Sequence, residues 1–210
     1  MARKLDSKCA RCRREGEKLF LKGERCYTPK CAFTRRAYAP GQHGATSRGR
    51  QSEFGLQLQE KQKARHEYDV LERQFQLYFE QAQKQSGVTG EQLLQLLETR
   101  LDNVVMRMQI AKSARRLARQ IVRHGHITVN GTKVTVPSFS VKVGDTVAVL
   151  ESARDNAYFA DIKKTVQPKL VPSWLEMDAE KLEAKVVALP KAEDVEHNIA
   201  LPQIVEYYSR

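Results

Sequence analysis

All four cysteines of this 210-residue chain lie within its first 31 residues, in a segment too polar to build a hydrophobic core. They form two pairs, Cys9 with Cys12 and Cys26 with Cys31, and 13 residues separate the pairs. Spacings of two and four residues allow both sulfurs of a pair to bind one ion, and two pairs complete a tetrahedron. The pattern predicts one structural Zn²⁺ that replaces the missing core, with an iron–sulfur cluster or a redox disulfide pair as alternatives.

The positive charge of the chain is concentrated in two blocks. Residues 1–65 hold 17 basic and 6 acidic side chains, and residues 100–133 hold 8 basic side chains against the single acid Asp102. The net charge is +11. Two separate basic blocks favour a polyanionic partner, whereas simple solubility is the alternative interpretation.

The apolar residues give no sign of a membrane protein. No run of 18 apolar residues occurs, and the basic start of the chain has no apolar stretch behind it. Such a sequence lacks both a spanning helix and a secretory signal, so we expect a cytoplasmic protein with no membrane partner.

The spacing of apolar residues predicts helices in the middle of the chain. Apolar residues at three- and four-residue steps predict one helix over residues 56–86, ended by Gly87. Thr89 begins a capping box, and the helix after it carries an apolar face from Leu93 to Met108.

A further helix and a hairpin follow. Ser113 is the expected N-cap of this helix, and Gly125 stands where a left-handed C-terminal residue is needed. Asn130-Gly131 separates two alternating segments, and this dipeptide is the strongest short signal for a β-hairpin.

These elements predict an α+β fold. Its parts are a zinc-bound arm, a helical domain, a small helix–helix–hairpin RNA-binding module and a C-terminal return segment that packs back on the helical domain. The expected boundaries are 1–50 for the arm, 51–98 for the helical domain, 99–165 for the module and 166–210 for the return segment.

The segment from Tyr38 to Gly44 is the first candidate RNA contact. Its glycines allow backbone N–H groups to approach phosphates, and Tyr38 and His43 are suited to stack on unpaired bases. Arginines on both sides can pair with phosphates. A flexible basic loop is the alternative interpretation.

The helix after Ser113 is the second candidate RNA contact. Arginines occupy the face opposite its apolar residues, and no acid occurs between Asn103 and Val143. A rigid row of guanidinium groups suits the phosphates of A-form RNA, whereas a solvated charged face normally mixes signs. The full set of candidate RNA-binding residues is Arg35, Arg36, Tyr38, Gly41, Gln42, His43, Gly44, Arg48, Arg50, Lys61, Lys63, Arg65, Arg100, Arg115, Arg116, Arg119, Gln120, Arg123, His124, His126, Asn130 and Lys133.

No catalytic constellation is visible in the sequence. It contains neither a phosphate-binding loop nor a nucleophile elbow, and its five histidines show no ligand or triad spacing. The sequence therefore predicts neither an enzyme nor a small-molecule substrate.

Several motifs together resemble one family. RLDNVV at 100–105, HGHI at 124–127 and VNG at 129–131 resemble the small RNA-binding module named after ribosomal protein S4. YAPGQHG at 38–44 and PSWLE at 172–176, with EKQK at 60–63 and IVEYYS at 204–209, are similar to the bacterial ribosomal protein S4 family itself. The four cysteines match the zinc-carrying version of that family.

The resemblance implies a structural constituent of the small subunit in the cytoplasmic ribosome. Family members bind the 5′ domain of 16S ribosomal RNA, nucleate assembly of the subunit body and influence translational accuracy. The resemblance further implies contacts with ribosomal protein S5, with S3 and with mRNA, and autogenous repression of translation. The chain departs from the family at Ala45 to Gln51, where only Arg48 and Arg50 are basic.

Two other functions fit parts of the sequence. An RNA-modifying enzyme with the same module would need a catalytic domain of roughly 150 residues, for which the rest of the chain offers no pattern. A zinc redox switch would need exposed thiolates, whereas the paired cysteines favour a closed site.

Overall fold

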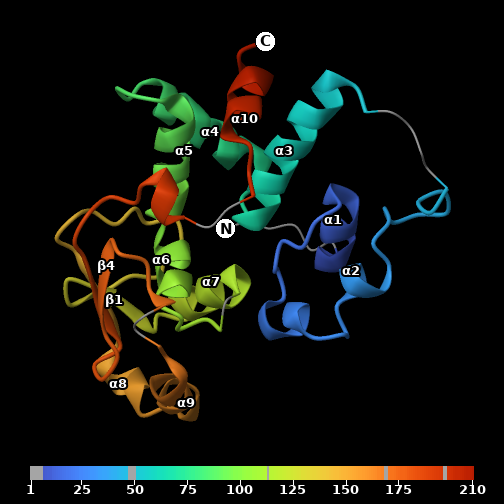
Figure 1. Ribbon diagram of the computed structural model, residues 1–210. Helices are drawn as coiled ribbons and strands as arrows, with labels where there is room; N and C mark the ends of the chain where they lie inside the picture. Colours follow the sequence, from blue (N-terminus) through green and yellow to red (C-terminus); the bar gives the residue numbers. More distant parts are fainter. Residues whose placement is uncertain (1–6, 47–50, 113, 168–169, 196–197) are drawn as a thin grey trace. The chain divides into compact units, whose positions relative to one another are not determined.

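The computed structural model describes residues 7–46, 51–112, 114–167, 170–195 and 198–210 (Figure 1). The chain divides into two compact units. One consists of Met1–Leu93 with His197–Arg210, and the other of Leu94–Glu196. None of the helices in the described residues combines the length and the hydrophobicity that a membrane-spanning segment requires.

The first unit is helical, and helix α10 (Leu201–Tyr208) at the C-terminus packs against α3 (Glu53–Glu67) (Figure 1). Helix α1 packs against both α2 and α3. The elements of this unit are α1 (Lys8–Glu15), η1 (Gly23–Tyr27), α2 (Ala32–Arg35), α3 (Glu53–Glu67), α4 (Glu72–Gln83), the start of α5 (Thr89–Glu98) and α10 (Leu201–Tyr208).

The single helix predicted over residues 56–86 is wrong, because the chain turns between α3 and α4. Asp69 has a left-handed backbone with φ 48°, and the N–H group of Val70 donates to the carbonyl of Arg65. Aspartate tolerates this conformation better than most residues do. The apolar stripe therefore belongs to two helices, which periodicity alone does not separate.

An aromatic cluster attaches α10 to α4. The ring of Tyr208 stacks on Phe79 at 4.5 Å and lies 6.4 Å from Phe75. The hydroxyl of Tyr208 donates to Glu72 at 3.1 Å. Burial raises the pKa of Tyr208, and the charge of Glu72 raises it further, so the hydroxyl stays protonated and keeps this bond.

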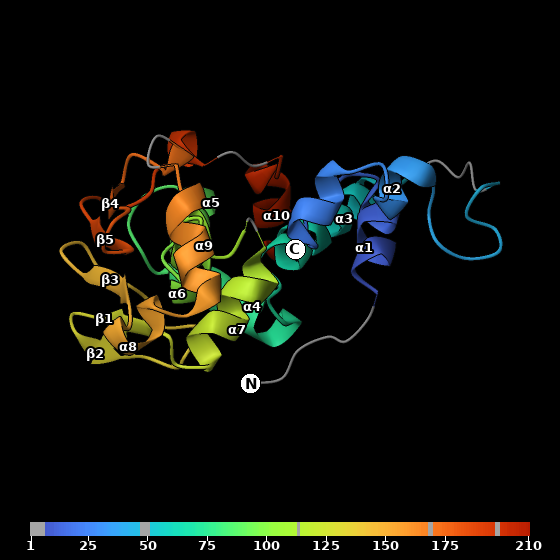
Figure 2. The same cartoon turned by 90° about the horizontal axis from the view of Figure 1, so that it is seen from below.

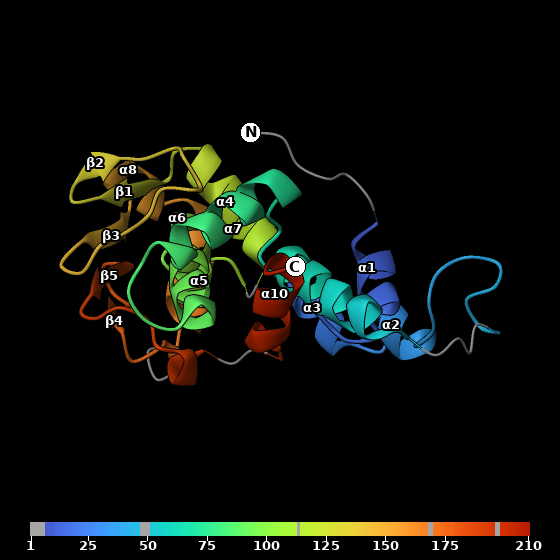
Figure 3. The ribbon, with the colours of Figure 1, turned by 90° about the horizontal axis from the view of Figure 1, so that it is seen from above.

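The second unit contains one antiparallel sheet with strand order β2-β1-β3-β5-β4, which Figures 2 and 3 show from opposite sides. Its elements are the end of α5, α6 (Leu101–Arg107), α7 (Arg115–Arg123), β1 (Ile127–Val129), β2 (Thr132–Lys133), β3 (Thr146–Val149), α8 (Glu151–Arg154), α9 (Ala157–Thr165), β4 (Leu175–Asp178), β5 (Glu183–Val186) and η3 (Ala192–Asp194). Side chains from the sheet and from α6, α7, α8 and α9 share one buried apolar core.

The long apolar face from Leu93 to Met108 also belongs to two helices. Arg100 has an extended backbone and forms an isolated β-bridge with Ser140. The next N–H group, that of Leu101, donates to the carbonyl of Phe139 at 2.8 Å. The break between α5 and α6 therefore comes from pairing with a distant segment, which periodicity does not reveal.

The predicted ends of α7 and of the hairpin are mostly confirmed. Gly125 follows α7 with φ 73°, and the hairpin residues Asn130 and Gly131 have φ 50° and 79°. The expected cap Ser113 lies outside the described residues, and the structure has Ala114 at the N-cap position without a side-chain hydrogen bond.

The C-terminal segment differs from the expected boundaries. Strands β4 and β5 belong to the sheet of the second unit, and the indole of Trp174 is buried in its core. Of the expected return segment 166–210, the described residues 198–210 belong to the first unit and residues 170–195 to the second. Among the described residues, strand β4 pairs with β5 alone at the edge of the sheet, and its residues show no clear alternation of apolar and polar side chains.

Candidate nucleic-acid interface and cysteine arm

The four cysteines lie on consecutive short elements of the arm, of which the structure describes residues 7–46. Cys9 and Cys12 lie on α1, Cys26 lies in η1, and Cys31 is the N-cap residue of α2. Cys12, Cys26 and Cys31 are buried, whereas Cys9 is half-buried. Together with Leu19, the three buried thiols form most of the apolar interior of the arm.

The electrostatic environments of the thiols are linked. Burial raises the pKa of the Cys12 thiol, and the charges of the other three cysteines raise it further. Burial also raises the pKa of Cys26, while the backbone N–H group of Lys22 opposes this rise. The sulfurs of Cys9, Cys26 and Cys31 are therefore near enough to Cys12 to affect its ionisation.

The thiol of Cys31 differs from those of Cys12 and Cys26. Burial would raise its pKa, but hydrogen bonds from the backbone of Thr34 and Phe33 outweigh burial and lower the pKa below its ordinary value. A thiolate at a helix N-terminus is stabilised in this way.

The donor chemistry of the arm fits Zn²⁺, because four thiols are the ligand set of a closed structural site. Over the described residues, however, the structure contains no group of three or more His, Cys, Asp or Glu side chains arranged to hold a metal ion. The zinc site predicted from the cysteine spacing therefore stays a prediction.

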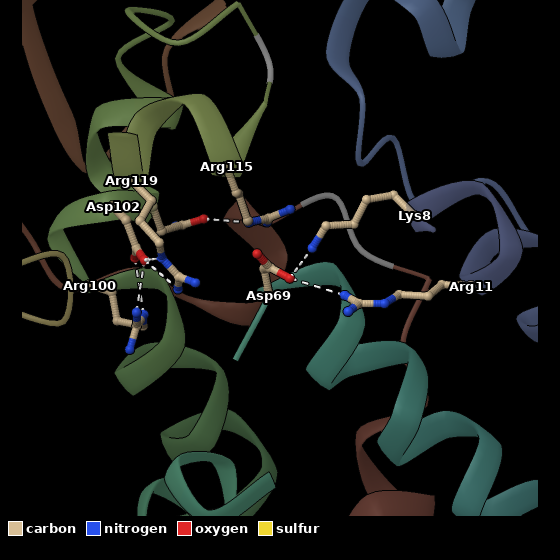
Figure 4. Close-up of polar contacts among 8 residues, drawn as sticks. Lys8, Arg11, Asp69, Arg100, Asp102, Arg115 and Arg119 are labelled. Atoms are coloured by element: carbon tan, nitrogen blue, oxygen red, sulfur yellow. Dashed lines mark hydrogen bonds and ion pairs between the residues drawn. The ribbon is translucent and has the colours of Figure 1, made fainter. Parts of the chain in front are cut away.

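Buried ion pairs fix α1 against the end of α3. Lys8 and Arg11 lie one turn apart on α1 and point toward the carboxylate of Asp69, with Arg11 Nη1 at 3.0 Å from Oδ1 (Figure 4). Further along α1, Glu15 Oε1 lies 3.0 Å from Nδ1 of His66. The left-handed Asp69 between α3 and α4 thus carries the carboxylate that holds the arm.

Three candidate RNA-binding residues of α3 are internal. Only 3% of Lys61 is exposed, and its ammonium group lies 2.6 Å from Glu72. Lys63 is also buried and pairs with Glu17 at 2.6 Å, while Arg65 lies 3.3 Å from Glu72. These cations are part of the structure of the first unit, and their contact with RNA stays a prediction.

Arg13 of α1 binds the segment from Tyr38 to Gly44. Arg13 donates from Nε to the carbonyl of Tyr38 at 2.9 Å and from Nη2 to Ala39 at 3.3 Å. Its guanidinium also lies 5.0 Å from the centre of the Tyr38 ring. A Cβ atom on Gly44 would overlap the carbonyl of Ala39, so the turn requires glycine there.

The other candidates of the arm are mostly exposed. Arg35, Arg36, Gln42 and His43 present their side chains to solvent. Gly41 has φ 112°, which favours glycine. Arg48 and Arg50 lie outside the described residues.

Helix α7 divides its polar residues between two faces. Arg116, Gln120, Arg123 and the following His124 are exposed, and their spacing places them on one side of the helix. Arg116 and Arg123 have no carboxylate partner in the described part of the chain. This side is an exposed cationic surface.

The other polar face of α7 is paired inside the unit (Figure 4). Arg119 Nη2 lies 2.9 Å from Oδ2 of Asp102, and Arg100 binds the same carboxylate through Nε at 3.0 Å and Nη2 at 2.8 Å. Arg115 donates to the side-chain oxygen of Asn103 at 2.9 Å. The guanidinium groups of Arg100, Arg115 and Arg119 therefore have internal partners.

A second buried carboxylate lies at the end of α5. Glu98 is 0% exposed, and its carboxylate accepts hydrogen bonds from Arg107 at 2.8 Å and from Asn103 at 2.7 Å. Sequence reasoning missed the roles of Glu98 and Arg107. The pairing of the other buried carboxylate, Asp102, could have been predicted from the sequence, because Asp102 is the single acid among the eight basic residues of 100–133.

The remaining candidates surround the hairpin. The stem of Lys133 lies over Gly125, where a Cβ atom would come within 2.2 Å of Cε. The side chain of Asn130 bonds to Asp145 at 2.8 Å and to the N–H group of Thr146 at 2.9 Å, so it supports the turn. His126 is half-buried and lies edge-on to Phe159.

Two family profiles match the chain. They are described as the Ribosomal protein S4/S9 N-terminal domain, over residues 3–98, and the S4 domain, over residues 99–147. Similar curated relatives include Small ribosomal subunit protein uS4 of Acetivibrio thermocellus at 57% identity, uS4A of Alkaliphilus metalliredigens at 56% and uS4 of Heliobacterium modesticaldum at 55%. Each match covers 100% of this chain and 100% of the relative.

Proposed function

The chain belongs to the ribosomal protein S4 family, and from this premise we propose that it binds small-subunit RNA chiefly through its exposed cationic surfaces. It is a structural constituent of the small ribosomal subunit and not an enzyme, and its location is the cytoplasmic ribosome. The proposal concerns which of its residues make the contacts.

The exposed face of α7 is the observation that carries this proposal. Arg116 and Arg123 are exposed on a rigid helix, whereas Arg115 and Arg119 are paired with internal groups. Phosphate contacts require accessible guanidinium groups, and A-form RNA is recognised mainly by shape and phosphates. The proposed contacts are Arg35, Arg36, Tyr38, Gly41, Gln42 and His43 in the arm and Arg116, Gln120, Arg123, His124 and Lys133 in the second unit.

The finer partners follow from family resemblance. We propose the 5′ domain of 16S ribosomal RNA as the binding region and ribosomal proteins S5 and S3 as neighbours, with contact to mRNA near Arg48 and Arg50. Roles in assembly of the subunit body, decoding accuracy and autogenous repression belong to the same proposal. An RNA-modifying enzyme or a zinc redox switch is not favoured, because the relatives matched over the whole chain are ribosomal constituents.

Filter binding of the full chain to small-subunit RNA at increasing salt tests the proposed function. We expect tight binding whose affinity falls steeply with salt, because phosphate contacts release counterions. Large-subunit RNA of equal length is the matched control. Equal affinity for both RNAs would contradict the proposal.

We also propose that the four cysteines bind one structural Zn²⁺. In support, these residues are all the cysteines of the chain, three of them are buried, and the charges of the other three raise the pKa of Cys12 beyond the effect of its burial. Burial opposes ionisation of the Cys31 thiol, but hydrogen bonds from the backbone of Thr34 and Phe33 outweigh burial and lower its pKa, which favours the thiolate form that binds metal. When bound, the ion would supply a cross-link between the elements of the arm.

Metal analysis and limited proteolysis test this proposal. One zinc per chain is expected, and a chelator is expected to expose residues 1–35 to protease while residues 99–150 stay resistant. The quadruple variant with serine at each cysteine should resemble the chelated protein. An arm that resists cleavage after metal removal, in the absence of RNA, would contradict the proposal.

A further inference from the structure

Two aromatic rings of the arm lie on its surface instead of in its interior. Phe20 is 39% exposed and Tyr27 is 67% exposed, whereas the adjacent Leu19 is only 5% exposed. The two rings stack with centroids 4.9 Å apart and an interplanar angle of 29°. The arm thus buries its leucine and its thiols and leaves a stacked aromatic pair in contact with solvent.

The backbone of this segment directs the two rings outward. Phe20 has a left-handed backbone with φ 48°, which is unusual for a bulky residue. The N–H group of Gly23 donates to the carbonyl of Phe20, and that of Lys22 donates to the buried sulfur of Cys26. The turn and η1 therefore place Cys26 inside while Phe20 and Tyr27 remain outside.

The sequence around the rings is cationic. Residues 18–30 contain four basic side chains and one acid, Glu24. Lys22, Arg25 and Lys30 are exposed, and Lys22 and Arg25 each lie two residues from one of the rings. Exposed aromatic rings between cations are the composition of sites that stack single-stranded bases and hold the adjacent phosphates.

We propose that Phe20 and Tyr27 form a stacking site for an unpaired base of RNA, with Lys22 and Arg25 contacting the flanking phosphates. The inference rests on the proposed RNA-binding function and adds a site to it. The positive charge around the rings favours a polyanion over the apolar side chain of a partner protein. Every base has a π-face, so the site selects unpaired nucleotides and not a particular sequence.

The decisive variants separate the aromatic rings from their apolar surface. Phe20→Leu with Tyr27→Leu keeps apolar side chains but removes both rings, whereas Phe20→Tyr with Tyr27→Phe keeps both rings. Leu77→Ala is the control for loss of exposed apolar surface, because Leu77 on α4 is also exposed. Circular dichroism and metal content confirm that each full-length variant is folded.

Binding to small-subunit RNA and the chemical reactivity of its unpaired bases are then measured together. We expect the double leucine variant to lose roughly tenfold in affinity, since stacking contributes about 1–3 kcal/mol per base. The salt slope should stay unchanged, because no phosphate contact is lost. At least one unpaired base should become more reactive, while the ring-conserving variant and Leu77→Ala should match the wild type.

Each outcome has a defined meaning. Unchanged affinity and base reactivity in the double leucine variant would overturn the stacking site, as would lower affinity without a change at any base. If the double variant is unstable, Tyr27→Leu alone repeats the test at the more exposed ring. Wild-type protein without preference for small-subunit RNA would instead overturn the proposed function.

Discussion

The first unit and the second unit both bury charged side chains, but the amount of apolar core around these side chains differs. In the arm, where Leu19 and three thiols form most of the apolar interior, the buried cations Lys8 and Arg11 pair with Asp69. In the second unit, Asp102 and Glu98 lie beside an extensive apolar core that already joins the sheet and helices. Buried ion pairs therefore contribute a larger share of the packing of the arm than of the packing of the second unit.

The number of basic residues in a segment also differs from the number whose side chains are exposed. Many of the basic residues in the first block are internal, including Lys63 and Arg65. In α7, by contrast, exposed and paired arginines alternate along one helix. A count of basic residues therefore overestimates the surface that remains available to RNA.

The largest expected effect is that of Asp69→Asn in the first unit. The substitution leaves Lys8 and Arg11 buried without their carboxylate, and such breakage typically costs about 3–5 kcal/mol. Urea unfolding followed by helical circular dichroism should show an earlier loss of the first unit. The fluorescence of Trp174, the single tryptophan, should report an unchanged second unit.

The control for this prediction is Asp161→Asn, which removes an exposed pair with Lys112. Its effect should stay below about 1 kcal/mol because solvent screens the pair. A stable Asp69→Asn protein would show that the arm does not depend on this carboxylate.

Glu98→Gln in the second unit should have a smaller effect. The amide keeps a polar group beside Asn103 but removes the charge that pairs with Arg107, at an expected cost of about 1–3 kcal/mol. The apolar core should keep the unit folded. The transition of Trp174 fluorescence in urea should shift to lower concentration, and a shift larger than that of Asp69→Asn in its own unit would reverse the comparison.

The sequence predicted the helix and hairpin of the second unit better than it predicted which charged side chains form internal ion pairs. Gly125, Asn130 and Gly131 require positive φ, and this local signal identified the end of α7 and the hairpin. The cations that pair with Asp69 lie 58 and 61 positions away from it, and Arg119 lies 17 positions from its partner Asp102. Periodicity and charge counts carry no information about such partners.

A pH-dependent effect is expected to be smaller still. Burial of Glu72 would raise its pKa, but the hydrogen bond and charge of Lys61 outweigh burial and lower the pKa below its ordinary value. Its contribution to stability is therefore complete above the pKa of the unfolded chain and disappears as pH falls through the folded value.

Thermal unfolding between neutral and acidic pH measures this contribution. Glu72→Gln should flatten the acid part of the stability profile by less than about 1 kcal/mol, because the side chain is partly exposed and screened. Glu80→Gln, at an exposed position of α4, should leave the profile unchanged. Identical stability profiles for both variants would show that the ionised Glu72 does not contribute to the stability of the fold.

The most direct test of accessible against paired charge compares two double variants of α7. Arg116→Gln with Arg123→Gln removes exposed cations, and Arg115→Gln with Arg119→Gln removes paired ones. Affinity for small-subunit RNA is measured at several salt concentrations beside urea unfolding. Loss of Arg116 and Arg123 should reduce the steepness of log binding constant against log salt concentration by about 0.7–0.9 for each phosphate contact, with unchanged stability. Loss of Arg115 and Arg119 should mainly lower the free energy of unfolding. An equal loss of slope from the paired set, with stability intact, would contradict the account.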